Sequence, residues 1–177
     1  MNRKNFSQTS NCNGFTLSEL LVTILIIILV GITIGGGFTA IHNSYDRISK
    51  KAEAEILLST TAYKISHLIR YASEIDQSED KVYFTDPNTG YRICIDNANK
   101  YEHHIKGIAV RYCSGEQIVE SHQLLSDDTI GEQLTPKIKE IHWDKPSNYS
   151  TFTIEIYSNN SPKPLISDTI SVDLLNE

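Results

Sequence analysis

The chain has 177 residues, the length of one ordinary domain or of a small domain with a membrane anchor. It carries 16 basic and 22 acidic residues, which give a net charge of −6. Proteins that bind nucleic acids usually present a basic surface to the phosphates, so this balance argues against a nucleic-acid partner. The charges are also segregated, because residues 15–41 contain a single one, Glu19. This segregation argues against an ordinary soluble cytoplasmic enzyme.

The N-terminal region combines a short polar leader with a long apolar segment. Residues 1–14 include Arg3 and Lys4 and no acidic residue. Residues 15–34 are mostly aliphatic and contain no proline. As a helix they would rise about 30 Å, which is the thickness of the hydrocarbon core of a bilayer. A core helix of a soluble protein is rarely apolar all round over this length, so we predict a membrane-spanning helix.

Three ordinary explanations of this segment fit incompletely. A secretory signal peptide needs a basic start, a short apolar stretch and a small-residue cleavage site. Leu20–Ile34 followed by Gly35–Gly37 nearly meets that description, but the long leader and Glu19 fit it poorly. A lipoprotein signal would place its cysteine after the apolar run, whereas Cys12 precedes it. A plain single-pass anchor leaves Glu19 unexplained.

Six residues at the start of the apolar segment indicate which kind of membrane segment it is. They read Gly14-Phe15-Thr16-Leu17-Ser18-Glu19, after a basic leader and before an unbroken aliphatic run. This arrangement resembles the class III signal of type IV prepilins and pseudopilins, and the resemblance covers about the first 40 residues. It implies that a prepilin peptidase cleaves between Gly14 and Phe15 and methylates the new amino terminus at Phe15. It also implies that Glu19, the fifth residue of the mature chain, aligns neighbouring subunits during assembly.

The physical chemistry of Glu19 agrees with this role. An ionised carboxylate in hydrocarbon costs about 2.5–3.5 kcal/mol on insertion scales unless it has a partner. The α-amino group released at Phe15 is the natural partner, in the same or a neighbouring subunit. The alternative is that Glu19 reaches water at the membrane interface. Gly35–Gly37 stand about where many pilins carry a proline. They could soften the helix or permit tight helix packing, and both explanations remain open.

The resemblance implies a non-enzymatic structural subunit of a type IV pilus, a competence pseudopilus or a type II secretion-type filament. The long, irregular C-terminal region favours a minor subunit. The implied partners are prepilin peptidase, other pilin or pseudopilin subunits, membrane lipid, and the assembly platform with, indirectly, its ATPase. No cofactor is expected. The head would be extracytoplasmic on a single-pass cytoplasmic membrane protein and, after assembly, on the cell surface. The alternative is an anchored extracytoplasmic binding or enzyme domain that uses the helix only as a tether.

The expected organisation is a leader at 1–14, a transmembrane and assembly helix at 15–41, an amphipathic helix at 42–75 and a β-rich head at 76–177. Apolar residues recur every three or four positions in two stripes, which predict one helix face on a core and a helix end near Ser73 or Ile75. The first stripe is Phe38, Ile41, Tyr45, Ile48, Ala52 and Ile56, and the second is Leu58, Ala62, Ile65, Ile69 and Ala72.

After Asp80 the apolar pattern changes to a period of two and turn residues multiply, as in Asp86–Gly90. Residues 120–136 are polar and acidic and predict a loop or an excursion at the sheet edge. The fold class is therefore α+β, a long helix packed on a mostly antiparallel sheet. The predicted strands are Lys81–Thr85, Tyr91–Ile95, Ile105–Cys113, Gln117–Glu120, Ile138–Trp143, Ser150–Tyr157 and Pro164–Val172.

Other chemistry is sparse. Cys94 and Cys113 are a candidate disulfide in an oxidising exterior, although a simple hairpin would place Cys94 opposite Lys106. Two buried, unpaired thiols are the alternative. We expect no metal site. His103 and His104 with the two cysteines match no familiar zinc spacing, and Asp127, Asp128 and Glu132 lack the regular spacing of a calcium loop.

Overall fold

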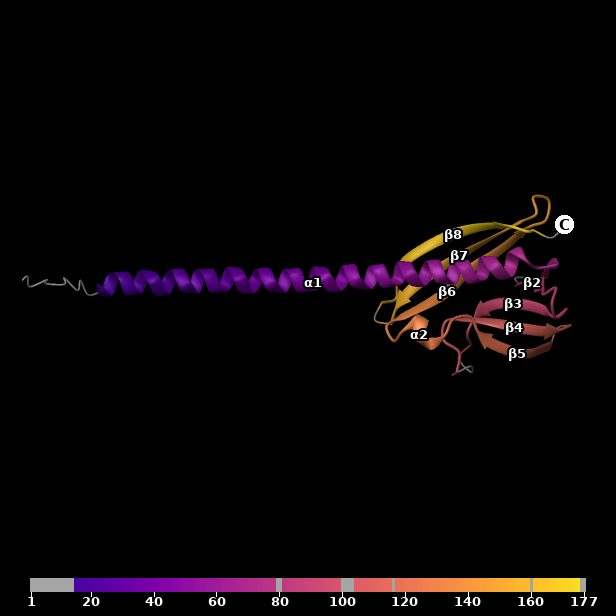
Figure 1. Ribbon diagram of the computed structural model, residues 1–177, viewed down its shortest axis with the longest axis horizontal. Helices are drawn as coiled ribbons and strands as arrows, with labels where there is room; N and C mark the ends of the chain where they lie inside the picture. The colour runs from indigo at the N-terminus through magenta and orange to yellow at the C-terminus, as the bar shows by residue number, and fades with distance from the viewer. Residues whose placement is uncertain (1–14, 79–80, 100–103, 116, 160, 176–177) are drawn as a thin grey trace, which may run out of the picture. The chain divides into compact units, whose positions relative to one another are not determined.

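The computed structural model describes residues 15–78, 81–99, 104–115, 117–159 and 161–175. Two compact units divide between Arg47 and Ile48. The fold is α+β, as predicted, with a long N-terminal helix packed against antiparallel sheets (Figure 1). The elements are α1 Leu17–Arg70, β1 Glu74–Ser78, β2 Lys81–Thr85, β3 Arg92–Asn97, β4 Ile108–Ser114, β5 Gln117–Gln123, α2 Asp127–Ile130, β6 Leu134–Asp144, β7 Tyr149–Ser158 and β8 Pro164–Asp173.

Helix α1 has 54 residues and continues through Gly35–Gly37. It ends at Arg70, a few residues before the predicted end, and the Arg70 carbonyl accepts a hydrogen bond of 3.1 Å from the Leu175 amide. The chain then forms β1, which the sequence did not predict because this segment is polar. Its partner explains the strand, since β1 pairs along its whole length with β2.

The apolar first part of α1 is not covered by any of the side chains that the structure describes. Every residue from Phe15 to Asn43 is exposed, including the large aliphatic residues from Leu20 to Ile34. Hydroxyl groups on this part are satisfied inside the helix: Thr23 donates to the Glu19 carbonyl at 2.6 Å and Thr39 donates to the Gly35 carbonyl at 2.8 Å. By length and composition, α1 can therefore span a membrane.

The two predicted apolar stripes of α1 have different outcomes. The second stripe is confirmed, because Leu58, Ile65 and Ile69 are buried. The first stripe was expected on the core and is exposed instead, and the exposure of its large side chains ranges from 66% at Ile56 to 74% at Phe38. The reason is geometric: at 100° per residue the first stripe lies almost opposite the buried face. The buried side chains are Ala54, Leu57, Leu58, Thr61, Ile65 and Ile69.

The first sheet is an antiparallel meander in the order β1-β2-β3-β4-β5. Its β2–β3 turn is the predicted one at Asp86–Gly90, where Gly90 has φ of +69°. The Asp86 carboxylate accepts hydrogen bonds from the Asn88 amide at 3.0 Å and the Thr89 hydroxyl at 2.8 Å. The bond from the Asn88 amide is the main reason that the pKa of Asp86 lies below its usual value.

The second sheet is an antiparallel meander in the order β6-β7-β8. On the central strand β7, Phe152, Ile154 and Ile156 are fully buried, as their alternation predicts. The prediction of a loop or edge excursion at 120–136 is wrong in part, because the segment contains regular structure. Strand β5 extends to Gln123, α2 occupies Asp127–Ile130 and β6 begins at Leu134. Leu124, Leu125 and Ile130 are the buried residues that tie this segment to the core.

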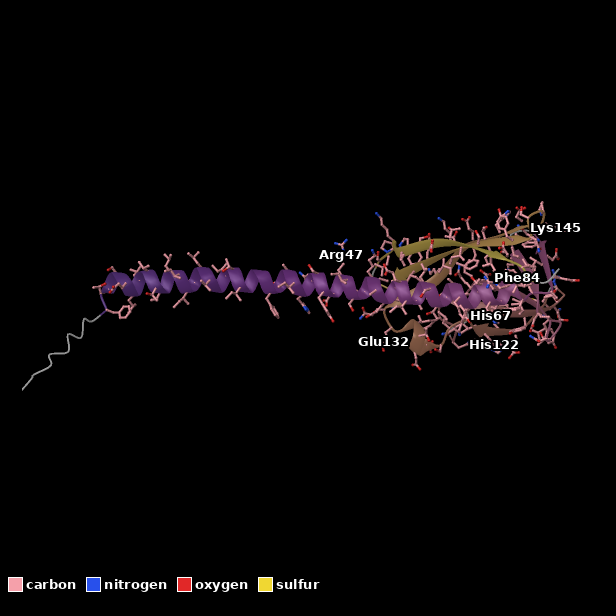
Figure 2. All side chains as sticks on the ribbon, turned by 45° about the horizontal axis from the view of Figure 1, so that its top comes forward. Arg47, His67, Phe84, His122, Glu132 and Lys145 are labelled. Carbon is pink, nitrogen blue, oxygen red and sulfur yellow. The ribbon has the colours of Figure 1, made fainter. Side chains whose placement is uncertain are left out.

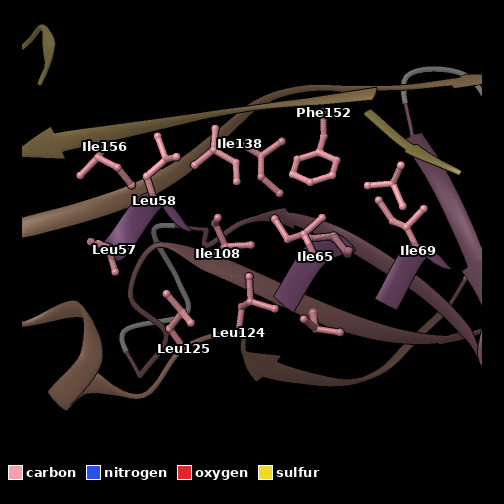
Figure 3. Close-up of a cluster of buried hydrophobic side chains, with 14 of the residues drawn as sticks. Leu57, Leu58, Ile65, Ile69, Ile108, Leu124, Leu125, Ile138, Phe152 and Ile156 are labelled. Atoms are coloured by element: carbon pink, nitrogen blue, oxygen red, sulfur yellow. The ribbon is translucent and has the colours of Figure 1, made fainter. Parts of the chain in front are cut away.

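The core of the second unit lies between the two sheets. In Figure 3 the side chains of Leu58 and Ile65 on α1 lie between Phe152 of β7 and Ile108 and Leu124 on the side of the first sheet. Both sheets therefore bury their apolar faces against the same helix, which is the usual reason for layers in a small domain.

Polar and backbone contacts join the first sheet to β6. The side-chain amide of Asn97 donates to the Ile138 carbonyl at 2.7 Å, and its oxygen accepts from the Ile138 amide at 2.8 Å. The register of β6 with β7 shifts between Ile138 and Glu140 at this point. Nearby, Gly107 has φ of +76°, and a β-carbon there would lie 2.9 Å from Pro136. A side chain at this position is therefore excluded by both backbone conformation and space.

Candidate functional site

The start of α1 is built as a reciprocal cap around Thr16 and Glu19. The Thr16 carbonyl accepts the first helical hydrogen bond, from Leu20 at 3.2 Å. Both the amide and the hydroxyl of Thr16 donate to Glu19 Oε2, at 2.9 and 2.8 Å. The Glu19 amide donates to Thr16 Oγ1 at 3.4 Å. This is a capping box, in which a Thr and a Glu three residues later satisfy backbone amides at a helix N-terminus.

The capping box fixes one oxygen of the Glu19 carboxylate and leaves the other available. Oε1 has no hydrogen-bond partner among the residues that the structure describes, and the whole side chain is exposed. The helix dipole also favours a negative charge in this first turn. Phe15, which is 80% exposed, precedes the cap by one residue. Gly14, the other side of the predicted cleavage site, lies outside the described residues.

Thr16 is the residue of this site that the sequence analysis missed. The signal was present, because Thr16 and Glu19 have the spacing of a capping box before an apolar run. The motif by itself predicts a role for Glu19 but not for Thr16. The structure pairs this carboxylate with Thr16 at the start of the same helix. Glu19 therefore stabilises the helix start, and any role in assembly would be in addition to this one.

The two cysteines lie on neighbouring strands of the first sheet as free thiols, and both are buried. The predicted register is wrong: Cys94 faces Arg111, and Cys113 faces Arg92. The reason is that β3 extends to Asn97 and β4 begins only at Ile108, so the hairpin loop lies further along the chain than predicted. Cys94 and Cys113 are thus diagonal neighbours on one face of the sheet. Burial is the main cause that raises the pKa of the Cys94 thiol.

This environment predicts slow chemistry at Cys94. Because the thiolate is the reactive form, a buried thiol with a raised pKa should react with iodoacetamide about tenfold or more slowly than in unfolded protein at pH 8. Protein purified without reductant would be alkylated in buffer and in urea, and each cysteine followed by peptide mass spectrometry. We expect both thiols to be fully labelled in urea. A disulfide-linked peptide joining Cys94 and Cys113 would contradict the structure.

Arg111 is the largest fully buried side chain on this face of the sheet. Its guanidinium donates to Asp96 Oδ2 at 2.9 Å and to the Asn97 carbonyl at 3.1 Å. Lys81 lies 3.9 Å from the same carboxylate oxygen. A buried cation needs such partners, so we interpret this cluster as structural support for the β3–β4 pair.

Among the described residues, no group of three or more His, Cys, Asp or Glu side chains gathers as a metal site would require. Asp127 and Asp128 open the short helix α2, and Glu132 follows it. The Asp127 carboxylate accepts a hydrogen bond from the Gln123 side chain at 2.9 Å. His103 lies outside the described residues.

Comparison with known proteins gives no match: no family model, no curated protein and no solved structure shows significant similarity to the chain.

Proposed function

We propose that this protein is a pilin-like structural subunit, processed by a prepilin peptidase and assembled with other such subunits into a type IV pilus, pseudopilus or secretion-type filament. The observation that carries the proposal is the placement of one carboxylate. Glu19 is the single charge in residues 15–41 and stands five residues into the expected mature chain. An intramembrane charge of this kind is functional more often than incidental.

Two features of α1 support the proposal. Its first part exposes aliphatic side chains on all sides, and such a surface is stable only against lipid or other apolar helices. The capping box leaves Glu19 Oε1 open to a further donor, which the methylated amino group of a neighbouring subunit would supply. The second compact unit, residues 48–177, combines the end of α1 with the head, has its own core and would be carried outward.

The test is the chemical identity of the mature N-terminus. The chain would be expressed in cells that contain a prepilin peptidase, purified from membranes and analysed by intact and peptide mass spectrometry. We expect a mature chain that begins at N-methylated Phe15. A chain that still begins at Met1, or one cut after Gly35–Gly37 by a signal peptidase, would contradict the proposal. A simple tethered domain predicts no methylated amino group.

A variant sharpens this test. Gly14→Leu should block processing almost completely, because the larger side chain crowds the site that the peptidase must reach. Asn13→Leu is the matched control, since it adds the same side chain one residue earlier. Normal maturation of Gly14→Leu would rule out cleavage of the class III type at this bond.

A further inference from the structure

Helix α1 leaves part of the first sheet open. Five strands spaced about 4.8 Å apart extend over about 19 Å, whereas a helix with its side chains is about 10–12 Å wide. A strip of the sheet above β4 and β5 therefore stays uncovered by the helix. A cavity of about 410 Å³ opens there between α1 and the sheet. Figure 2 labels His67 and His122, which line it from the helix and from β5. This volume is typical of a small-molecule site.

Aromatic rings line the two sides of this opening in two rows. We call it the aromatic groove and define it by Tyr63 and His67 on α1, Tyr71 just after the helix end, and Tyr112 and His122 on the sheet, with Tyr91 edge-on against Tyr112. Ring centroids along the helix row are 6.4 and 4.8 Å apart. Along the sheet row they are 6.5 and 5.6 Å apart. A smaller cavity of about 190 Å³ shares His67 and Tyr112 and continues the groove toward the β2–β3 turn.

Three of these rings are largely exposed, whereas Tyr112 is partly buried against the core. Tyr63 is 71% exposed, Tyr91 is 48% exposed and Tyr71 is 47% exposed. The two rows follow from backbone geometry. Residues four apart share one face of a helix, and paired residues on neighbouring strands lie side by side. Exposed large apolar side chains gathered in a concave surface mark a binding site more often than scattered ones do. The ring spacing is comparable to the length of one hexose unit.

The charged side chains of the groove indicate which class of ligand, among those that stack on aromatic side chains, it can bind. Lys64 is the permanent cation in its lining, and its ammonium donates to the Leu124 carbonyl at 3.1 Å. Two N–H groups of Lys64 remain for a ligand, and His67 adds a further donor, whereas His122 Nε2 lies 3.0 Å from Glu120 Oε1. Single-stranded nucleic acid would need several cations along its phosphates, and Glu120 and Asp86 flank the groove with the opposite charge. One anionic group on an otherwise uncharged ligand fits this lining.

We propose that the aromatic groove binds an acidic oligosaccharide. The C–H face of a hexose ring packs against the electron-rich face of an aromatic side chain, and successive rings follow the two rows. A carboxylate on a uronic acid unit meets the ammonium of Lys64, in a charge-assisted hydrogen bond. The site lies wholly within residues 48–177, so it stands independently of how the N-terminus is processed.

The test measures binding of two matched trisaccharides by isothermal titration calorimetry. The full chain would be held in a polyoxyethylene detergent, because maltoside detergents carry sugar headgroups that would compete. We expect a trisaccharide of two galactose units and one galacturonic acid unit to bind at least about fivefold more tightly than the uncharged trimer of galactose. Lys64→Gln should remove this difference, whereas Lys163→Gln, which changes a lysine outside the groove, should keep it.

An aromatic variant tests the stacking surface separately. Tyr63→Ala should weaken binding of the acidic trisaccharide by about three- to tenfold. Tyr45→Ala is the matched control, because Tyr45 is 69% exposed and lies outside the groove. Circular dichroism would confirm that each variant is folded. The proposal is overturned by no detectable binding, by equal affinity for both trisaccharides, or by equal losses in the two tyrosine variants. Tighter binding of an oligothymidine or a proline-rich peptide would overturn it as well.

Discussion

Glu19→Gln should abolish incorporation into filaments while leaving membrane insertion and cleavage intact. The amide oxygen of Gln can replace the carboxylate in the capping box, so the helix start is kept and the negative charge alone is lost. Insertion should be unchanged or slightly better, because a charge is removed from the segment expected to enter the bilayer. If the charge pairs with an amino terminus, a loss of about 1.4 kcal/mol or more corresponds to at least tenfold less incorporation. Sheared-surface fractions compared with membrane fractions would measure this.

Thr16→Val provides the matched control for Glu19→Gln. It removes the hydroxyl that donates to Glu19 but keeps the charge and nearly the same shape. The helix cap should weaken by about 1 kcal/mol, and incorporation should stay within about twofold of the unmodified chain. If Glu19→Gln assembles normally, or if Thr16→Val fails equally, the charge has no role in assembly and the cap explains Glu19. If Glu19 merely reaches water at the membrane interface, Glu19→Gln should likewise leave filament incorporation unchanged.

Phe152→Ala should destabilise the head by about 3–5 kcal/mol, a large part of the 5–15 kcal/mol that holds a typical domain folded. Phe152 is fully buried at the centre of β7, so its removal would leave a cavity between the sheet and α1. Urea unfolding of the full chain in micelles would be followed by the fluorescence of Trp143. This is the single tryptophan, and it is partly buried against the same core.

Phe38→Ala is the matched control, because Phe38 is 74% exposed and belongs to the other compact unit. The same chemical change there should alter the unfolding of the head by less than about 0.5 kcal/mol. A cost below about 1 kcal/mol for Phe152→Ala would contradict the position of this side chain in the core.

The sequence predicts the fold best where one local pattern decides it. The alternation of Phe152, Ile154 and Ile156 predicts β7, and the turn residues of Asp86–Gly90 predict the connection of β2 to β3. Periodicity is less informative where a segment offers two apolar faces. The stripe from Phe38 to Ile56 has the same spacing as the buried one, and only the packing of the sheets decides which face is covered.

Structural features that depend on residues far apart in the sequence could not be predicted from local patterns. Strand β1 is polar and exists because β2 pairs with it, and the hairpin register of Cys94 follows from strand ends that no turn signal marks. The groove also depends on the width of the sheet relative to one helix. At the N-terminus of α1, the motif predicts Glu19 as the residue that matters, whereas its hydrogen bonds to Thr16 became apparent only from the geometry.

The pair of hydrogen bonds between Asn97 and Ile138 has a consequence for how the head opens. Ile138 stands where β6 bulges, and its amide proton is held by a side chain from the other sheet. Exchange of this proton with deuterium therefore requires the two sheets to separate, even if β6 remains paired with β7. Its exchange rate would report undocking of the sheets separately from fraying of a strand. Asn97→Ala would convert that slow exchange into a fast one without removing any apolar contact.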